Sequence, residues 1–307
     1  MFWWILIKVK INGKVFNTGQ PTKEKKVILK DAFSEGSKML KLSNIEAPVV
    51  TAGAMLCHVL GCDKAYLYSH DDYSLSKSEY DKYFEALKRR IDGEPLQYIT
   101  GSQEFMSLGF FVSPDVLIPR QDTEILVESV IEIAKGKEFV NILDIGTGSG
   151  CIAISLAYFI KNSRVTGLDI SKGALSIARK NAQKCGVSDR ANFIESNLFE
   201  NVTFRDFDII VSNPPYIPRQ DVETLERQVK DFEPRSALDG GIDGLDFYMK
   251  IVKESIDYLK PKGLLAFEVG FDQAQDVVKI MEESFDELKT EKDLAGIERV
   301  VMGIRSK

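Results

Sequence analysis

The chain has 307 residues, of which 44% are apolar and 28% charged, which is typical of a soluble globular protein long enough for two domains. Its net charge of −6 argues against a protein whose whole surface binds nucleic acid. The charge is uneven, because residues 1–30 hold seven lysines and only one acidic residue, Glu24. This basic terminus predicts either contact with RNA or an acidic partner or, more simply, a solvated tail.

The cysteines and the first apolar segment bear on the compartment. No two cysteines form a CxxC pair, and only His58 and His70 could join them, so no metal site is predicted. Residues 2–7 are apolar but too few to span a bilayer, and no signal-peptide cleavage pattern follows them. We therefore expect a cytoplasmic protein with reduced, buried thiols at Cys57, Cys62, Cys151 and Cys185.

Residues 1–22 are expected to be an N-terminal extension that contains a β-hairpin. Strand-like residues over 3–18 are divided by Asn12-Gly13, a strong signal for a two-residue turn. A lone hairpin is only marginally stable in water. The hairpin must therefore pack on another part of the chain, or it is not essential to the fold.

Residues 23–93 are predicted to form a small helical domain that binds a partner. An apolar helix over 49–60 ends at Gly61, and Ser76 with Glu79 forms a capping box at the start of another helix. Four residues behind this box lie on one helical face, namely Tyr80, Phe84, Leu87 and Ile91. Gly93 and Pro95 then end the helix.

Residues 94–121 are expected to be an extended linker with a β-hairpin that turns near Leu108-Gly109. Helical spacing resumes after Asp122, and strands alternate with helices from residue 140 onward. The predicted strands cover 140–145, 165–169, 192–195, 207–212, 264–269 and 299–304. The predicted helices cover 151–159, 174–185, 245–259 and 274–285. This alternation indicates a three-layer α/β domain over 122–307 with a mainly parallel sheet.

A glycine-rich turn follows the first of these strands, with glycines at positions 146, 148 and 150. Glycines let a ligand approach the backbone, and the helix that starts there favours an anionic group. Asp169 ends the next strand, where a carboxylate can bind a ribose diol. A dinucleotide-binding oxidoreductase uses similar parts, but its fingerprint is G-x-G-x-x-G, and a purely structural turn is the simpler alternative.

The motif Asn213-Pro214-Pro215-Tyr216 follows the strand at 207–212. The two prolines have no backbone N–H, so the backbone offers only carbonyl acceptors there. Asn213 adds a side-chain acceptor and a donor pair, and Tyr216 adds an aromatic face. The motif therefore suits a planar group that carries an NH2, and a structural Pro-Pro turn is the alternative.

Together these segments resemble the S-adenosylmethionine-dependent methyltransferases of the seven-stranded, Rossmann-like class I fold. In that class the glycine turn passes the methionine moiety, the acid after the second strand binds the ribose, and the residues after the third strand lie near adenine. An acid is common where Asn197 stands, and Asn can still exchange hydrogen bonds with the adenine amino edge. The resemblance implies a product S-adenosylhomocysteine and a cofactor site formed by Asp144, Gly146, Thr147, Gly148, Gly150, Asp169, Asn197, Leu198 and Asn213.

Related methyltransferases with Asn-Pro-Pro-Tyr act on nitrogens conjugated with a planar system, such as adenine N6, guanine N2 and the glutamine amide. The resemblance makes Asn213, Pro214 and Tyr216 the catalytic residues, with Pro215 beside them. Hydrogen bonds to Asn213 and to the Pro214 carbonyl would aim a poorly nucleophilic nitrogen at the methyl group. No strong general base is needed, because the methylated amide readily loses its extra proton.

Three segments outside this motif distinguish between these possible acceptors. They lie at residues 94–101, 119–124 and 232–238. They resemble release-factor glutamine N5-methyltransferases, which modify the glutamine of the Gly-Gly-Gln loop in peptide-chain release factors. The resemblance covers roughly residues 30–307 and implies release factors as partners, with neither membrane nor direct nucleic-acid binding. The family usually has a second proline where Gln121 stands. Substrate contacts are expected from Phe111 and Arg120, whereas Phe105 and Phe110 are expected in the core; structural ion pairs are the alternative for Arg120 and Arg235.

Three other interpretations stay open. A DNA adenine-N6 methyltransferase normally carries a basic target-recognition region, which the acidic balance beyond residue 30 opposes. A ribosomal-RNA guanine-N2 enzyme fits the basic terminus better, but not the segment at 119–124. A nucleotide-binding scaffold is opposed by Asn213 and Tyr216 standing beside an intact glycine turn.

Overall fold

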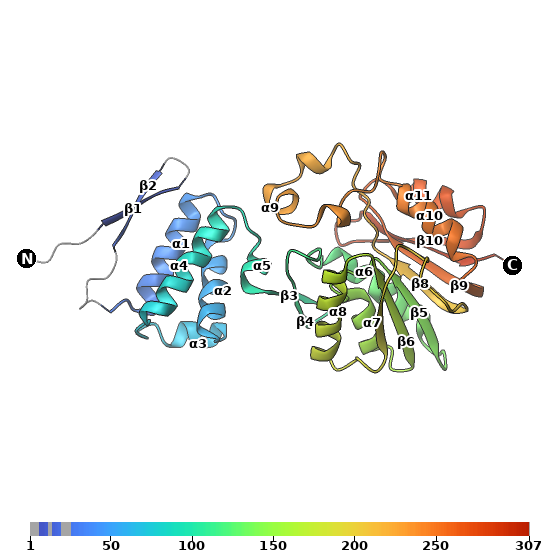
Figure 1. The fold of residues 1–307 in the computed structure, drawn as a ribbon, viewed down its shortest axis with the longest axis horizontal. Helices are drawn as coiled ribbons and strands as arrows, with labels where there is room; N and C mark the ends of the chain where they lie inside the picture. The colour runs from blue at the N-terminus through green and yellow to red at the C-terminus, as the bar shows by residue number, and fades with distance from the viewer. Residues whose placement is uncertain (1–5, 12–13, 20–25, 307) are drawn as a thin grey trace, which may run out of the picture. The chain divides into compact units, whose positions relative to one another are not determined.

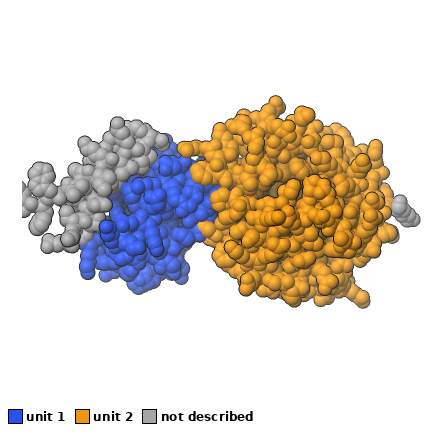
Figure 2. All heavy atoms as spheres, viewed as in Figure 1, with its two compact units in different colours: residues 1–100 blue, residues 101–307 orange. Residues whose placement is uncertain are grey.

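The computed structural model describes residues 6–11, 14–19 and 26–306. The chain forms two compact units, residues 1–100 and 101–307, and Figure 2 colours them separately. The division between Thr100 and Gly101 lies within the segment predicted as a linker. Each unit has its own hydrophobic core.

The first unit contains two strands and five helices among its described residues. Strands β1 (Leu6–Ile11) and β2 (Lys14–Gly19) pair antiparallel, with Ile11 opposite Lys14, and the predicted turn residues Asn12 and Gly13 lie outside the described residues. The helices are α1 (Leu29–Leu42), α2 (Pro48–Leu60), α3 (Lys64–Ser69), α4 (Lys77–Ile91) and α5 (Leu96–Thr100).

The predicted ends of α2 and α4 are confirmed. At the start of α4, the Glu79 N–H donates to Ser76 Oγ at 3.2 Å, and the Ser76 N–H donates to Glu79 Oε2 at 2.6 Å. Helix α2 ends at Gly61, whose φ of +64° is the left-handed conformation that glycine adopts readily. Helices α1, α2 and α4 then bury an apolar core that includes Met55, Leu56, Tyr83 and Leu87.

The segment predicted as an extended linker is wrong in two details. It opens with helix α5, because Pro95 suits a helix start and its carbonyl accepts from the N–H groups of Tyr98 and Ile99 at 3.1 and 3.2 Å. Strands β3 (Ser102–Phe105) and β4 (Leu108–Phe111) do form an antiparallel hairpin. Its turn lies at Met106-Ser107, where the Met106 N–H donates to Glu124 Oε1 at 2.6 Å, rather than at Leu108-Gly109.

The second unit contains a seven-stranded sheet in the order β10-β11-β9-β8-β5-β6-β7. Figure 1 shows this sheet, with β5, β6, β8, β9 and β10 labelled. The strands are β5 (Val140–Ile145), β6 (Ser163–Asp169), β7 (Ala191–Glu195), β8 (Phe207–Ser212), β9 (Leu259–Glu268), β10 (Phe285–Lys292) and β11 (Glu298–Arg305). The neighbours from β7 to β9 pair in parallel, whereas β11 is antiparallel to both β9 and β10. The predicted α/β class and seven-stranded sheet are confirmed.

Helices cover both faces of this sheet. Helices α6 (Asp122–Ala134), α7 (Cys151–Phe159) and α8 (Lys172–Lys184) pack on one face, against side chains such as Ile142 and Val165. Helices α10 (Asp246–Ser255) and α11 (Ala274–Met281) pack on the other face, against Leu143 and Phe267. Successive strand residues therefore enter opposite cores, which explains the nearly continuous apolar runs in the sequence. Short helices η1 (Val222–Thr224), α9 (Arg227–Lys230) and η2 (Arg235–Ala237) follow β8.

Two expectations about this unit, and one about the cysteines of both units, are wrong. Strand β10 is missed because its residues are mostly polar and exposed, as suits a sheet edge. The helix predicted over 245–259 ends at Ser255, and the strand after it begins at Leu259 rather than at residue 264. The prediction placed this strand too late because Pro261 and Gly263 suggest a turn, although β9 already runs through them. Of the cysteines predicted to be buried, all of which are described, only Cys151 is fully buried.

The topology brings two distant motifs together. Strand order reverses between β5 and β8, which are parallel neighbours with Ile145 opposite Ser212. The Ser212 hydroxyl donates to the Ile145 carbonyl at 2.7 Å and ties the two strand ends together. Ligands of open α/β sheets bind outside the carboxyl ends of the strands at such a reversal. The glycine turn follows β5 there, and Asn213-Pro214-Pro215-Tyr216 follows β8.

Candidate active site

A cavity of about 580 Å³ lies at the carboxyl ends of the central strands. The predicted site residues that line it are Gly146, Gly148, Asp169, Asn197, Leu198, Asn213, Pro214 and Pro215. The structure thus places the proposed cofactor residues and the proposed acceptor residues around one space. Asp144, Thr147, Gly150, Phe111, Arg120 and Tyr216 are not among the described residues that line it.

The three glycines of the turn have different roles. All three have left-handed φ angles, +74° at Gly146, +54° at Gly148 and +80° at Gly150. A Cβ at Gly146 or Gly148 would meet no atom within 4 Å, so these two glycines leave backbone exposed to the cavity. A Cβ at Gly150 would lie 2.8 Å from Ile154 Cδ1, so this glycine allows close packing inside the unit.

Asp169 links the end of β6 to the glycine turn. Its Oδ2 accepts from the Gly148 N–H and its Oδ1 from the Ser171 N–H, both at 2.8 Å. Burial raises the Asp169 pKa, whereas these backbone N–H groups lower it by stabilising the carboxylate. The carboxylate is therefore fixed in the cavity wall, with lone pairs left for the hydroxyl groups of a diol.

Asp144 and Thr147 support the turn from behind. Asp144 is fully buried, and its Oδ2 accepts from the Thr147 hydroxyl at 2.6 Å. Burial raises the Asp144 pKa to about 7. The Thr147 N–H donates to the Leu168 carbonyl at 2.8 Å, which joins the turn to β6. Both residues shape the turn from inside the unit.

Asn213 faces the cavity while its amide nitrogen is held from behind. Its Nδ2 donates to Thr123 Oγ1 at 3.2 Å, and Thr123 is only 2% exposed in the first turn of α6. The chain after Asn213 fits tightly against two glycines. A Cβ at Gly240 would lie 2.7 Å from the Pro215 carbonyl oxygen, and one at Gly244 would lie 2.2 Å from that of Tyr216. The position of the motif is therefore set by close backbone contact.

Tyr216 points into the unit. Its hydroxyl donates to Glu268 Oε1 at 3.3 Å, and burial raises the Tyr216 pKa well above its usual value. Its carbonyl accepts from Gln273 Nε2 at 2.9 Å. The aromatic face expected to stack on a substrate instead packs with the apolar core beneath α10 and α11. In this structure Tyr216 therefore anchors the motif.

The segments at 119–124 and 232–238 are joined by an ion pair. Arg120 Nη2 lies 2.6 Å from Glu233 Oε1, and the Glu233 side chain is only 2% exposed. Burial raises the Glu233 pKa, and the Arg120 guanidinium lowers it. Arg235 lines the cavity and forms its own pair with Glu223 at 2.6 Å. Both arginines thus hold loops of the site in place.

Two of the linker phenylalanines lie in the core as expected, whereas Phe111, expected to contact the substrate, lies on the surface and does not line the cavity. Phe105 and Phe110 are fully buried and meet edge to face, with ring centroids 6.1 Å apart. Phe111 is 44% exposed, and Lys184 Nζ lies 4.4 Å from its ring centroid. The side chain of Asn181 on α8 accepts from the Phe111 backbone N–H at 2.7 Å and donates to the Phe111 carbonyl at 3.0 Å. Phe111 is therefore held against α8.

Several lining residues were not expected from the sequence. Ile170 follows Asp169 and is 63% exposed, so it offers an apolar surface beside the carboxylate. The segment Asp115-Val116-Leu117, shortly after β4, also lines the cavity. In the sequence, an isoleucine directly after the strand-end acid was the available signal for an apolar ligand contact, whereas residues 115–117 carried none.

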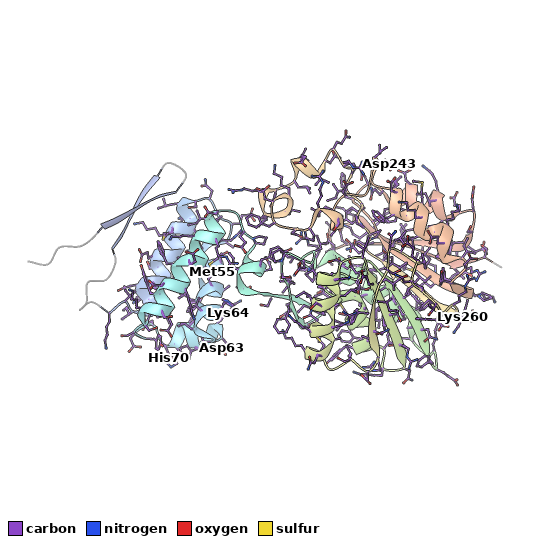
Figure 3. The ribbon with its side chains drawn as sticks, in the orientation of Figure 1. Met55, Asp63, Lys64, His70, Asp243 and Lys260 are labelled. Carbon is purple, nitrogen blue, oxygen red and sulfur yellow. The ribbon has the colours of Figure 1, made fainter. Side chains whose placement is uncertain are left out.

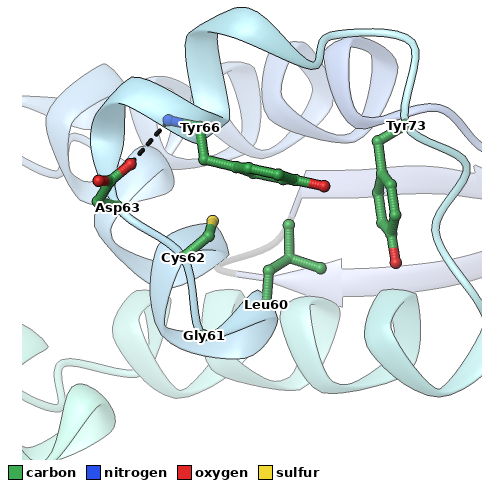
Figure 4. Close-up of a pocket in the computed structure, with 6 residues that line it drawn as sticks. All are labelled: Leu60, Gly61, Cys62, Asp63, Tyr66 and Tyr73. Carbon is green, nitrogen blue, oxygen red and sulfur yellow. Dashed lines mark hydrogen bonds between the residues drawn. The ribbon is translucent and has the colours of Figure 1, made fainter.

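A second hollow, of about 450 Å³, lies in the first unit among helices (Figure 4). There Leu60, Cys62, Tyr66 and Tyr73 surround the space, and Asp63 Oδ1 is occupied by the Tyr66 N–H at 2.7 Å. Asp63 thus caps helix α3, and the Tyr73 hydroxyl donates to Glu79 Oε1 at 3.1 Å. In the second unit, Figure 3 shows Lys260 far from Asp243, whose loop borders the larger cavity at Gly241. Lys260 pairs with Asp208 at 2.8 Å, at the start of β8 and away from the strand ends that form the site.

Models of known protein families match parts of both units. A model of the PrmC N-terminal domain matches residues 31–101, and a model of the methyltransferase small domain matches residues 121–232. The release factor glutamine methyltransferase of Koribacter versatilis is 42% identical over 276 residues, which cover 90% of this chain and 98% of that one. That of Geobacter sulfurreducens is 44% identical over 250 residues, with coverages of 81% and 87%.

The fold also occurs in solved structures. The T. thermophilus 16S rRNA N2 G1207 methyltransferase, in complex with AdoMet and guanosine, has a TM-score of 0.50 at 19% identity, covering 67% of this chain and 50% of that one. The sheet, the glycine turn and the matched domain define this protein as a methyltransferase. Its sequence identity to curated relatives, over almost their whole length, narrows this class to one family. The chain belongs to the release factor glutamine methyltransferase family.

Proposed function

We propose that this protein transfers a methyl group from S-adenosylmethionine to the side-chain amide nitrogen, N5, of the glutamine in the Gly-Gly-Gln motif of peptide-chain release factors. One observation supports this reaction most strongly. In a chain of this family, the glycine turn with Asp169 and the pair Asn213-Pro214 line the same cavity. A methyl donor and a planar amide acceptor could therefore meet there.

The residues on the cofactor side fit S-adenosylmethionine. Gly146 and Gly148 leave room for a ligand against the backbone, and the fixed Asp169 carboxylate suits a ribose diol. Ile170 offers an apolar contact for adenine, and Asn197 and Leu198 line the same space. When bound, this cofactor supplies an electrophilic methyl group on a sulfonium sulfur.

The residues on the acceptor side address the weak nucleophilicity of an amide nitrogen. Its lone pair is delocalised into the carbonyl, so positioning must provide much of the rate. Asn213 Oδ1 and the Pro214 carbonyl can accept its two N–H groups and stabilise the positive charge that develops as the new bond forms. Pro215 and Tyr216 fix this pair, the latter through Glu268, and Arg120 acts through Glu233 on the adjoining loop. The nitrogen then loses a proton without a strong base.

The proposed partner follows from the family, in which the helical domain of residues 23–93 would engage the release factor. Such a partner belongs in the cytoplasm. Among the described residues, no helix is both long and apolar enough to cross a membrane.

The test is incorporation of labelled methyl groups from S-adenosylmethionine into purified release factor, DNA and ribosomal RNA. We expect label in the release factor and none in a release factor whose Gly-Gly-Gln glutamine is replaced by alanine. Mass spectrometry of the loop peptide should place a single methyl group on that side chain. Label in DNA or RNA alone would overturn the proposal, and label elsewhere on the release factor would overturn the N5 assignment.

A further inference from the structure

A buried polar chain runs behind the acceptor side of the cavity. Asn213 Nδ2 donates to Thr123 Oγ1 at 3.2 Å. The Thr123 hydroxyl also lies close enough to the carboxyl group of Glu268 to lower the Glu268 pKa, and Glu268 Oε2 is buried without a hydrogen-bond partner among the described residues. Both Thr123 and Glu268 are only 2% exposed, so water cannot readily replace either partner. These residues come from α6, from the end of β9 and from the loop after β8.

The chemistry of this chain sets the direction of its hydrogen bonds. An ionised carboxylate can only accept, so the Thr123 hydroxyl stabilises it by directing its one proton toward Glu268. The oxygen of that hydroxyl can then only accept, and the Asn213 group facing it must be the NH2. The other end of the amide, Oδ1, is thereby directed to the acceptor side of the cavity.

We propose that Thr123 and Glu268 are positioning residues that hold Asn213 with its Oδ1 toward the nitrogen to be methylated. This inference rests on the proposed function, because it concerns the same acceptor nitrogen. With the amide reversed, Asn213 would direct an NH2 at the NH2 of the substrate. The reversed arrangement loses one hydrogen bond and leaves two donors facing each other, which should slow turnover by about 10- to 100-fold.

The direction of the chain depends on the charge of Glu268. Burial raises the Glu268 pKa to about 7. Above that pH the group is acceptor-only, whereas below it the carboxylic acid can donate to Thr123 and free the hydroxyl proton to turn elsewhere. The titratable and charged groups that face Glu268 are Asp122 on α6, Cys151 on α7, Tyr216 after β8, Tyr248 on α10 and Arg299 on β11.

The test compares single-turnover methylation of release factor by the full-length protein and three variants. Thr123→Val keeps the side-chain shape but removes the hydroxyl, and Thr123→Ser restores it. We expect the Val variant to lose about 10- to 100-fold in rate, with cofactor Kd and release-factor KM changed by less than about threefold. The Ser variant should recover most of that rate. Thr290→Val is the matched control, because it removes a Thr-to-Glu hydrogen bond of 2.8 Å on the edge strand β10.

Glu268→Gln supplies a second readout that simple loss of packing would not move. The wild-type rate should rise with pH through about 7, and this rise should vanish in Glu268→Gln, whose amide does not titrate. A Thr123→Val rate within about threefold of wild type would overturn the inference. So would an unchanged pH rise in Glu268→Gln, which decides the matter even if Thr123→Val does not fold. Failure of the wild-type protein to methylate release factor would instead overturn the proposed function.

Discussion

Replacing Asp169 by alanine tests the assignment of the cofactor side. A lost hydrogen bond to a charged group weakens binding by about 1.5–3 kcal/mol, which is roughly a 10- to 150-fold rise in the Kd for S-adenosylmethionine. The structure adds a second effect, because Asp169 also accepts from the N–H groups of Gly148 and Ser171. Alanine leaves both without that acceptor and loosens the turn, so the upper part of the range is expected.

Asp169→Asn is the matched comparison. It keeps the size of the side chain and one acceptor oxygen for Gly148 but removes the charge, so its Kd should lie between those of wild type and Asp169→Ala. Isothermal titration calorimetry with S-adenosylmethionine and with S-adenosylhomocysteine measures each value, and thermal melting without ligand checks that the variants fold. A folded Asp169→Ala variant with wild-type affinity would remove Asp169 from the ribose role.

The remaining predictions concern the acceptor, the terminus and stability. Asn213→Ala should reduce kcat far more than cofactor affinity, as kinetics beside calorimetry would show; collapse of cofactor binding would contradict the assignment. Deletion of residues 1–22 should leave methylation of a Gly-Gly-Gln peptide intact, and its loss would show that the hairpin belongs to the fold. Wild-type stability should fall as pH rises from 4.5 to about 7, because the folded chain retains a proton on Glu268 that the unfolded chain releases. In urea titrations, the free energy of unfolding of Glu268→Gln should fall by up to ~3 kcal/mol less over this pH range than that of the wild type. An identical pH dependence in the two proteins would refute this prediction.

The central sheet could be predicted because one physical pattern dominates its sequence. Strands buried on both faces read as short apolar runs, and the turns between them carry glycine, proline or a helix cap. The predicted bounds of β5, α7 and β8 therefore match the structure residue for residue. The glycine turn and the Asn-Pro-Pro-Tyr motif follow two of these strands, so their proximity follows from the parallel topology.

The supporting contacts of the site could not be predicted in the same way. Thr123 and Glu268 lie far apart in the chain and meet only because α6 packs near the carboxyl end of β9. In the sequence each is an ordinary polar residue at the edge of an apolar run. The inward direction of Tyr216 likewise depends on Glu268, since aromatic residues after strands serve equally as ligand platforms and as anchors. Pairing across the fold, which no local pattern encodes, decides between these roles.

The charges around the cavity bear on the choice between protein and nucleic-acid acceptors, which the Asn-Pro-Pro-Tyr motif itself does not distinguish. Three cationic side chains are among the described residues that line the cavity. Arg219 pairs with Asp239 at 3.0 Å and Arg235 with Glu223 at 2.6 Å, whereas Lys250 Nζ lies 5.5 Å from the centroid of the Phe247 ring. Nucleic-acid binding draws its affinity from lysine and arginine side chains that neutralise phosphates. Arginines already neutralised by carboxylates offer little of that affinity, whereas a peptide loop needs none. A shallow dependence of methylation rate on salt would agree with a protein acceptor, and a steep one would favour phosphate contacts.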